Sequence, residues 1–386
     1  MRILFIAPGN SLHTVRWIDQ LRGAGEEILL FNSSSSILET IDKSLLYTPL
    51  VCVFDKSRYQ KVLDIFGLGL ITTTLLKRKQ IQEAIKIFKP DIVHVHWLLT
   101  PSALGCAFIN FENIVITPWG SDVIRSINTQ NWNFLKKVIW KTSILLISRN
   151  AKGICTDGEN TLRALAKYNS PARYLEIIRF GVDTDKFTPV ERDDQFYFST
   201  GADADSKIVI SNRALSLLYD VGTLLDAASQ VLTIHGKVIF AIFGDGQQRV
   251  KLEAKAKKLG ISSNVIFYGQ VEQRILTTAI ASSDLYVSTS TSDGGIAQSI
   301  SEAMACAIPV LITDISENAK WMSQSMAGET FLVGDSAVLA RLIIRYLTND
   351  GLSKEAGVRG RQFVLKENNS KNQVARMIAF YRRVAK

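Results

Sequence analysis

The sequence predicts an α/β protein built from two parallel sheets. Short apolar runs typical of buried strands alternate with helical patterns along the chain, and this alternation is typical of parallel sheets with crossover helices. The alternation restarts at about Ser206, after a stretch of loop signals around Pro189. At 386 residues the chain also exceeds what one hydrophobic core usually supports, so two domains are expected.

The pattern of apolar runs sets the expected elements in each half. In the first half, strands are expected at residues 3–7, 28–31, 92–95, 114–117, 153–156 and 175–178, with helices at 13–23, 61–88, 131–148 and 159–168. In the second half, strands are expected at residues 208–211, 238–243, 265–268, 285–288, 310–313 and 331–333. Helices are also expected at residues 296–306 and, with an amphipathic pattern, at 371–385.

The composition indicates a globular protein that is soluble or peripheral to a membrane. The net charge is +9, and most of the basic excess lies in the first 185 residues. No nucleic-acid-binding module is recognisable, so nucleic acid is not expected as a partner, and an anionic membrane surface is the better functional alternative. Two apolar, aromatic and basic stretches, 63–79 and 132–141, either pack on their own sheet or form such a surface.

Cysteine usage indicates a reducing compartment. The four cysteines lie in apolar runs without CxxC spacing, which predicts buried free thiols in a cytoplasmic protein: Cys52, Cys106, Cys155 and Cys306. The N-terminal apolar run is too short for a signal peptide, and no stretch approaches the roughly 20 apolar residues that span a bilayer. No metal-ligand cluster can be drawn, so neither a metal nor another cofactor is expected.

The segment from Ser288 to Asp314 carries the strongest site signal. A strand ends, the Gly294-Gly295 turn follows, and a helix then begins that contains Glu302. In such a crossover unit the N-terminus of the helix offers unpaired N–H groups to an anion, and Glu302 would accept hydrogen bonds from hydroxyl groups of the same ligand. The alternative for Glu302 is an ordinary exposed helix residue.

Loops after strands of the first half supply further candidates. Gly9, Asn10 and His13 follow the first strand, either as an ordinary loop or as a close approach to a ligand. The period of a strand places His94 and His96 on one face, with Val93, Val95 and Trp97 on the other. His96 is the better site candidate because it lies nearer the carboxyl end. Asp122 either caps the following turn or binds a sugar hydroxyl.

Several of these segments resemble the family 4 retaining glycosyltransferases. The matching residues are Glu302-Ala303-Met304-Ala305 with Pro309, the GSDV of residues 120–123, the interdomain segment RFGVDTDKFTP of 179–189, and Gly244-Asp245-Gly246 followed by NVIFYG. The resemblance implies the GT-B fold, two facing Rossmann-like domains with a deep interdomain cleft. It places an acceptor-side domain at 1–185, a nucleotide-sugar domain at 186–370, and a helix at 371–386 that crosses back to the first domain.

The resemblance also assigns roles. Arg213 is expected to bind the donor diphosphate, Glu302 the donor ribose, and the Phe267 segment to border the base, with Gly244 making the strand exit tight. The expected sugar pocket and its surroundings comprise Asp293, Gly294, Gly295, Ile296, Ala297 and Ser301. The chain departs from the family at three places: Gly294 stands where a Glu is usual, Leu218 or Tyr219 where a Lys is usual, and Trp119 where a His often contacts the donor sugar.

The resemblance therefore implies a hexosyltransferase-type retaining glycosyltransferase. It would move a sugar from a nucleoside diphosphate sugar to a hydroxyl of a saccharide or lipid-linked saccharide acceptor in cell-envelope glycan biosynthesis. We expect Arg213, Glu302 and Asp122 to be the catalytic residues, in a cytoplasmic enzyme at the inner face of the plasma membrane. The alternatives are a catalytically silent nucleotide-sugar-binding scaffold and a GT-B sugar-nucleotide epimerase.

Overall fold

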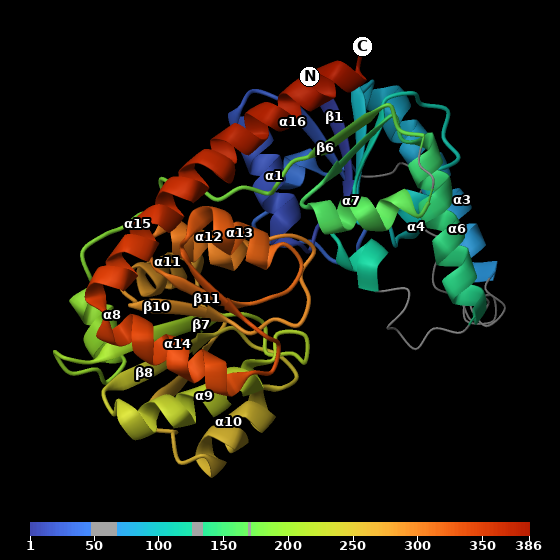
Figure 1. Ribbon diagram of the computed structural model, residues 1–386. Coiled ribbons are helices and arrows are strands. Elements are labelled where there is room, and N and C mark those ends of the chain that lie inside the picture. Colours follow the sequence, from blue (N-terminus) through green and yellow to red (C-terminus); the bar gives the residue numbers. More distant parts are fainter. Residues whose placement is uncertain (48–67, 126–133, 169–170) are drawn as a thin grey trace. The chain divides into compact units, whose positions relative to one another are not determined.

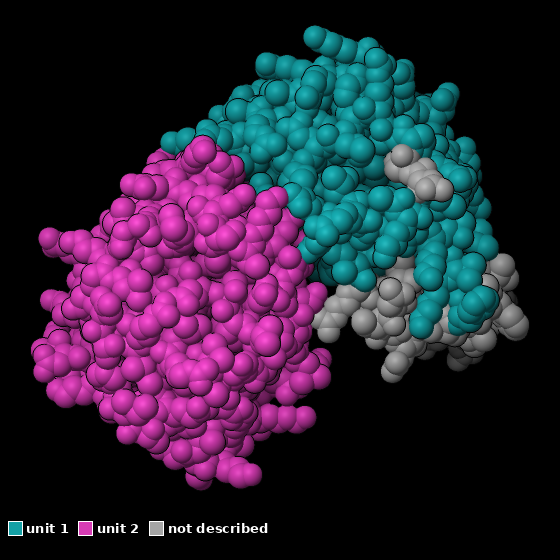
Figure 2. Space-filling model, in the orientation of Figure 1, with its two compact units in different colours: residues 1–180, 371–386 teal, residues 181–370 magenta. Residues whose placement is uncertain are grey.

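The computed structural model describes residues 1–47, 68–125, 134–168 and 171–386 (Figure 1). Its contacts divide the chain into two compact units, coloured separately in Figure 2. Unit 1 contains Met1–Phe180 and Lys371–Lys386, and unit 2 contains Gly181–Ser370. The last helix of the chain therefore belongs to the same unit as the first strand.

Unit 1 is a six-stranded parallel sheet with the order β2-β1-β3-β4-β5-β6. Apolar runs form its strands, and β3 and β4 are buried along their whole length because helices cover both faces. The strands are β1 (Arg2–Ala7), β2 (Glu27–Asn32), β3 (Ile92–His96), β4 (Ile114–Thr117), β5 (Gly153–Thr156) and β6 (Tyr174–Ile177).

Helices on the two faces bury separate cores in unit 1. Val93 and Val95 pack in the core that includes residues of α3, α4 and α6, whereas Ile92 packs in the core that includes residues of α1 and α16. The predicted alternation along β3 is thus confirmed. The helical segments are α1 (Leu12–Gly23), η1 (Lys43–Leu45), α3 (Leu68–Phe88), α4 (Pro101–Cys106), η2 (Ser121–Arg125), α6 (Phe134–Asn150), α7 (Glu159–Ala166) and α16 (Ser370–Val384).

Unit 2 repeats this architecture with the order β12-β11-β10-β7-β8-β9. Its strands are β7 (Lys207–Asn212), β8 (Val238–Phe243), β9 (Val265–Gly269), β10 (Leu285–Ser288), β11 (Val310–Thr313) and β12 (Gly328–Phe331). Its helices are α8 (Asp194–Ser199), α9 (Val221–Ile234), α10 (Arg249–Lys258), α11 (Gln273–Ala281), α12 (Gln298–Ala305), α13 (Asn318–Ser325), α14 (Ser336–Thr348) and α15 (Asp350–Glu367).

The predicted two parallel sheets are confirmed, and the last predicted strand is displaced. Residues 331–333 were the expected strand, but β12 spans Gly328–Phe331. It is an edge strand paired only with β11 in the sheet order, and its first three residues are only partly buried. An edge strand needs no apolar run, so the polar sequence Gly-Glu-Thr concealed it. Leu332 and Val333, which suggested a strand, are 66% and 45% exposed.

Each sheet reverses its strand order once. In unit 1, β1 lies between β2 and β3, and in unit 2, β7 lies between β8 and β10. The loops leaving the carboxyl ends of the two central strands at such a reversal diverge to opposite faces, which opens a crevice where ligands of α/β proteins bind. The reversals therefore select the loops after β1 and β3, and after β7 and β10, as the places to look for a site.

No helix of the described residues is long and apolar enough to cross a membrane. Residues 61–67 and 131–133 of two predicted helices lie outside the described residues. The same gaps take residues 63–67 from the predicted stretch 63–79 and residues 132–133 from the predicted stretch 132–141.

Close packing of α15 on the segment after α12 offers a test of this architecture. A Cβ atom on Gly357 would lie 1.9 Å from the carbonyl oxygen of Ala307, whereas one on Gly351, in the same helix, would lie 3.5 Å from its nearest neighbour, Asn349. We expect Gly357→Ala to lower the free energy of unfolding by roughly 1 to 3 kcal/mol through overpacking. Gly351→Ala should leave it unchanged or raise it by up to about 1 kcal/mol. Urea unfolding of both variants measures the difference, and equal effects would contradict this packing.

Candidate active site

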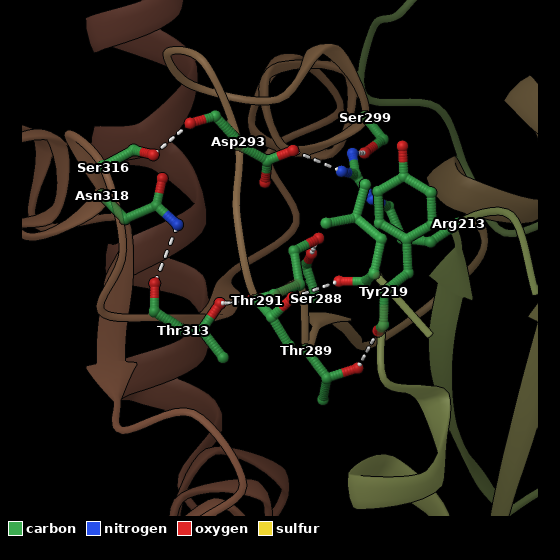
Figure 3. A network of polar contacts seen from close by, with 12 residues as sticks. Arg213, Tyr219, Ser288, Thr289, Thr291, Asp293, Ser299, Thr313, Ser316 and Asn318 are labelled. Atoms are coloured by element: carbon green, nitrogen blue, oxygen red, sulfur yellow. Dashed lines mark hydrogen bonds and ion pairs between the residues drawn. The ribbon is translucent and has the colours of Figure 1, made fainter. Parts of the chain in front are cut away.

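Arg213 lies at the reversal point of unit 2 and ties three segments together (Figure 3). It directly follows β7, and its Nη2 is 2.6 Å from Oδ1 of Asp293, in the loop between β10 and α12. Its Nη1 donates to Oγ of Ser299, in the first turn of α12, at 3.0 Å. Both side chains of the ion pair are largely buried, with 10% of Arg213 and 12% of Asp293 exposed.

Two tyrosines complete the surroundings of the guanidinium. The Arg213 guanidinium carbon lies 4.3 Å from the centroid of the Tyr219 ring, a cation–π contact. The Tyr286 hydroxyl donates to Ser299 Oγ at 2.9 Å. Burial lowers the pKa of Arg213, but the charge of Asp293 and the other contacts outweigh it, so the pKa lies above its usual value. Arg213 is therefore a fixed, fully charged cation.

Hydroxyl side chains fix the backbone of the loop that carries Asp293 (Figure 3). Thr289 Oγ1 donates to the carbonyl of Tyr219 at 2.8 Å, and both N and Oγ1 of Thr291 donate to the carbonyl of Leu218. Ser316 donates its hydroxyl to the carbonyl of Asp293 itself. The loops after β7, β10 and β11 are thereby joined, so the position of Asp293 relative to Arg213 is set by several independent contacts.

Glycines bring the exit of β8 against the Arg213 loop. A Cβ atom on Gly244 would lie 2.5 Å from the carbonyl oxygen of Arg213, and one on Gly246 would lie 2.4 Å from that of Leu215. Both have positive φ, +110° and +158°. Gly244 N also donates to Gly269 O at 2.7 Å. The tight strand exit expected at Gly244 is thus explained by direct backbone contact.

Phe267 is only partly available to a ligand. It lies on β9 and packs, partly buried, against the core beneath α9 and α14. Arg249 Nη2 donates to its carbonyl at 3.1 Å. The segment after it, which turns at Gly269 with φ +72°, is the part that approaches Gly244.

The start of α12 provides the anion-binding geometry that the sequence suggested. Gly294, Gly295 and Ile296 lead into Ala297, the N-cap residue. Its methyl side chain cannot accept a hydrogen bond, so no side-chain cap competes with another acceptor for the N–H groups of Gln298 and Ser299, whereas Ile300 N donates to Ala297 O. Further along α12, Glu302 is 4% exposed, which contradicts the reading of an ordinary exposed helix residue.

Ser301 does not have the access that a ligand contact requires. It is fully buried, and its Oγ accepts a hydrogen bond from Asn368 Nδ2, after α15, at 2.9 Å. A helix turns by about 100° per residue, so Ser301 and Glu302 cannot both face the same neighbour. Ser301 therefore holds α12 to the C-terminal part of unit 2, and its side chain is not accessible to a ligand.

An aromatic cluster marks the carboxyl edge of the sheet in unit 1. Trp119, after β4, makes edge contacts with His13 at 5.6 Å and Trp97 at 5.6 Å, measured between ring centroids. Phe180 lies 4.4 Å from His13. Trp97, directly after β3, has φ of +60°, a conformation that a bulky residue rarely adopts and that is typical of functional sites. All four rings are half-buried.

The glycine turn after β1 directly precedes the segment that carries His13 of this cluster. Gly9 is buried, and its N–H donates to Oδ1 of Asn32 at 2.8 Å. A Cβ atom at position 9 would lie 2.9 Å from that oxygen, so this close approach requires glycine. Asn10 is exposed, and the Ser11 hydroxyl caps α1 by accepting from His13 N at 3.2 Å.

A chain of buried hydrogen bonds holds the indole of Trp119. Trp119 Nε1 donates to His96 Nδ1 at 3.1 Å, which leaves the proton of His96 on Nε2, 3.3 Å from His94 Nδ1. His94 Nδ1 also contacts the hydroxyl of Tyr381 on α16 at 2.5 Å, and its Nε2 contacts Thr117 Oγ1 at 2.6 Å. Burial lowers the pKa of His94 well below the usual value and that of His96 to about 3, so both rings are neutral.

These contacts change the role assigned to His96. It is 1% exposed, and both ring nitrogens have partners within unit 1. His96 is therefore a positioning residue for Trp119, and the half-buried rings of Trp119 and His13 are the groups that a ligand can reach.

Asp122 holds two loops that precede it in the chain, which is neither of the two roles expected from the sequence. Its side chain is completely buried, Oδ2 accepts from Leu98 N at 2.8 Å, and Oδ1 accepts from Trp119 N at 2.9 Å. It joins the loops after β3 and β4 and so fixes the backbone on which Trp97 and Trp119 are carried. Burial raises the pKa of Asp122 to about 7 despite these hydrogen bonds.

Sequence reasoning missed the partners that lie far away along the chain. Tyr381 is 287 positions from His94, and Asp293 is 80 positions from Arg213. The signal for the second pair was present, since Asp293 precedes two glycines at the expected turn. Nothing in the sequence around Tyr381 marks it as a partner of a histidine.

The described cysteines are Cys106, Cys155 and Cys306, and all three are buried free thiols. Cys52 lies outside the described residues. Cys155 Sγ lies 2.6 Å from Thr117 Oγ1 and extends the hydrogen-bond chain of His94. Within residues 1–47, 68–125, 134–168 and 171–386, no group of three or more His, Cys, Asp or Glu side chains could hold a metal ion.

Two family models match the chain, one in each unit. Residues 193–363 match the model described as glycosyl transferases group 1, and residues 2–152 match the model described as glycosyl transferase 4-like. Phosphatidyl-myo-inositol mannosyltransferase of Mycobacterium leprae (strain TN) is 26% identical over 144 residues, which are 37% of this chain and 38% of that protein. The chain thus spans well under half of this relative.

A second relative and a solved structure match more of the chain. N-acetyl-alpha-D-glucosaminyl L-malate synthase of Bacillus anthracis is 23% identical over 299 residues, 75% of this chain and 74% of that protein. The crystal structure of Anabaena HepE in complex with UDP has a TM-score of 0.75 with 16% identity, covering 99% of this chain and 100% of that one. At this identity, the structure speaks for the fold alone.

The buried carboxyl group of Asp122 predicts a specific pH dependence. Because its pKa is about 7 in the folded protein and near 3.8 when unfolded, the folded state binds the extra proton between these values. The stabilisation is complete below about pH 4 and is lost as the pH rises through 7. The free energy of unfolding of the wild type should therefore lose this contribution as the pH rises, whereas Asp122→Asn has no carboxyl group to titrate at this position. We expect the difference in this free energy, variant minus wild type, to rise by a few kcal/mol between pH 4 and 8.

Urea unfolding of both proteins at several pH values measures this difference. Glu39→Gln is a suitable control, because Glu39 lies in the same unit and is exposed. A difference between Asp122→Asn and wild type that is flat with pH would show that the carboxyl group is ionised throughout.

Proposed function

Because this chain belongs to the GT-B glycosyltransferases, with the group 1 model matching residues 193–363 and the family 4-like model matching 2–152, we propose that it is a retaining hexosyltransferase. It moves a sugar from a nucleoside diphosphate sugar to a hydroxyl group of a saccharide or lipid-linked saccharide. The anomeric bond to the diphosphate breaks as a bond to the acceptor oxygen forms, and the proton of the acceptor hydroxyl leaves with the diphosphate.

The observation that carries this proposal is the position of Arg213. It lies at the reversal of strand order in unit 2, bonded to Ser299 in the first turn of α12. A guanidinium and the N-terminus of a helix converge there, and both favour phosphate oxygens. In this assignment they stabilise the departing diphosphate, and preorganised charge of this kind is the usual main term in catalysis.

Glu302 and the glycine turn take the remaining parts of the donor. A buried carboxylate on α12 suits two neighbouring hydroxyl groups of a ribose, because it accepts hydrogen bonds only. Gly294, Gly295, Ile296 and Ala297 would line the sugar, and Gly244 and the segment after Phe267 would border the nucleotide. The structure of HepE with UDP is consistent with a uridine donor as the first candidate.

The aromatic cluster of unit 1 is the proposed acceptor side. Half-buried rings of Trp119, His13 and Phe180 offer the apolar faces on which sugar rings stack, and exposed Asn10 adds an amide. Asp122, assigned to catalysis from the sequence, acts here by fixing the backbone of Trp119.

One observation favours a second candidate, a nucleotide-sugar-binding scaffold without turnover. Arg213 already has carboxylate and hydroxyl partners, and Tyr219 rather than a lysine stands beside it. A single, paired cation offers less stabilisation to a leaving diphosphate than two free ones. Turnover by the purified protein separates the two candidates.

Nucleotide binding and turnover test the donor assignment together. A ligand that binds only the folded state stabilises it by about 2.7 kcal/mol at a hundredfold excess over Kd. We expect one of UDP, GDP, ADP, dTDP or CMP to raise the melting temperature, and Glu302→Gln to weaken that ligand roughly 10-fold or more, because a charged acceptor is lost. The rate at which Glu302→Gln hydrolyses the matching nucleotide sugar, or transfers its sugar, should also fall.

Glu355→Gln, on the exposed face of α15, is the matched control and should change neither measurement. Stabilisation without turnover of any nucleotide sugar and acceptor would leave the scaffold as the function. A Glu302→Gln variant that binds the nucleotide as well as the wild type does would remove the ribose assignment.

We also propose that unit 1 contacts an anionic membrane surface that presents the acceptor. Ile71 and Leu75 on α3 are 53% and 50% exposed, and Phe134 and Val138 on α6 are 82% and 41% exposed. Both helices pack against α4, and both carry lysines that suit anionic headgroups. The basic excess of the first half supports the same surface.

Sedimentation with vesicles tests this surface. We expect binding to vesicles of phosphatidylcholine with phosphatidylglycerol at low salt, weakened several-fold by Phe134→Ser and by 0.5 M salt. Leu217→Ser, at a similarly exposed apolar position in unit 2, is the control and should bind as the wild type does. Absence of binding at low salt would remove the membrane from this proposal.

A further inference from the structure

The ion pair between Arg213 and Asp293 is an obstacle to the proposed donor site. Both terminal nitrogens of Arg213 have partners, Asp293 at 2.6 Å and Ser299 at 3.0 Å, and the Tyr219 ring covers one face of the guanidinium. A diphosphate that approached this arginine would meet the Asp293 carboxylate beside it. Two anions cannot share one largely buried cation without strong repulsion, so one of them must leave.

The surrounding contacts favour movement of the Asp293 side chain over movement of Arg213. Arg213 is held from two further sides by Ser299 and Tyr219. The Asp293 carboxylate has one further side-chain hydrogen bond, with Ser290. The backbone around it is held through Ser316 at Asp293 O and through Thr291 at Leu218 O. Gly294 and Gly295 follow directly and have no side chains to obstruct a new rotamer. Rotation of one carboxylate is therefore the smallest change that frees the arginine.

Resting on the donor assignment above, we propose that the donor diphosphate replaces Asp293 on Arg213, and that the released carboxylate binds hydroxyl groups of the donor sugar. Donor binding is thus a partner exchange, in which the contacts of the Asp293 carboxylate with Arg213 and Ser290 are replaced by contacts of Arg213 and Asp293 to one ligand. Asp293 directly precedes Gly294, the position of the missing glutamate, so it can supply a carboxylate to the same sugar pocket.

The exchange predicts opposite effects on bare nucleotides and on nucleotide sugars. A bare nucleoside diphosphate must break the ion pair and gives the released carboxylate no new partner. A nucleotide sugar breaks the same pair but supplies hydroxyl groups to it. Asp293 is then a specificity-determining residue, because it raises the preference of the site for the sugar-bearing donor over the product nucleotide.

Calorimetry on the full chain tests the exchange. The probes are UDP, GDP, ADP and dTDP and, for the nucleotide that binds, its sugar derivatives, such as UDP-glucose, UDP-N-acetylglucosamine or GDP-mannose. For the nucleotide that binds, we expect Asp293→Asn to bind the bare diphosphate at least 10-fold more tightly than the wild type. The association constant of this variant for the nucleotide sugar, divided by its association constant for the bare nucleotide, should be at least 10-fold smaller than in the wild type.

Two further variants make the result decisive. Asp226→Asn breaks an ion pair of the same 2.6 Å length, with Lys255, in unit 2 and should change neither affinity. Arg213→Gln combined with Asp293→Asn removes both charges without leaving one buried alone, and should lose the gain of the single variant. The melting temperature of each variant checks that it is folded.

Unchanged or weaker binding of the bare nucleotide to Asp293→Asn would overturn the exchange and leave the donor assignment standing. Tighter binding of the bare nucleotide with an unchanged ratio would overturn the sugar contact. Failure of folded wild type and variants alike to bind any probe would overturn the donor assignment itself, and the exchange with it.

Discussion

All strands of each sheet run in the same direction, and this constraint determines where the chain can bind anything. Parallel strands need crossover helices, so every loop that leaves a carboxyl end lies at one edge of its sheet. Strand order reverses beside β1 in one unit and beside β7 in the other. The half-buried aromatic rings of unit 1 and the Arg213 cluster of unit 2 both occur at these edges, although the two sets of residues have nothing else in common.

The polar groups buried at these edges are neutral in unit 1 and charged in unit 2. In unit 1, His94 and His96 are neutral, and their hydrogen bonds run in one direction from Trp119 to Thr117. In unit 2, the charges of Arg213 and Asp293 are retained and paired. A buried pair is weak evidence for stability, because desolvation offsets much of the attraction. Retained charge is easier to explain as a requirement of a charged ligand.

The sequence was sufficient for the sheets but not for the contacts between loops. Buried strands are apolar runs of β-branched residues, so eleven of twelve strands were found to within one residue, and only polar edge strand β12 was misplaced. The candidate loops followed from the ends of those strands. Pairings such as Arg213 with Asp293, or Tyr381 with His94, depend on which loops the sheet order brings together. Strand order is a tertiary property that no local pattern encodes.

The structure shows the surroundings of each departure from the family pattern within its own unit. Tyr219, at one of the two positions where the family's lysine was counted, stacks on Arg213 instead of adding a second cation. Trp119, where the family often has histidine, donates its indole N–H to His96, so its side chain has no donor left for a ligand. Gly294 directly follows Asp293, the carboxylate that we propose takes the role of the missing glutamate. A site that had simply decayed would have kept no reason to hold Trp119 and Arg213 in such specific, buried networks. The replacements therefore favour a site that has been retained over a site that has been lost.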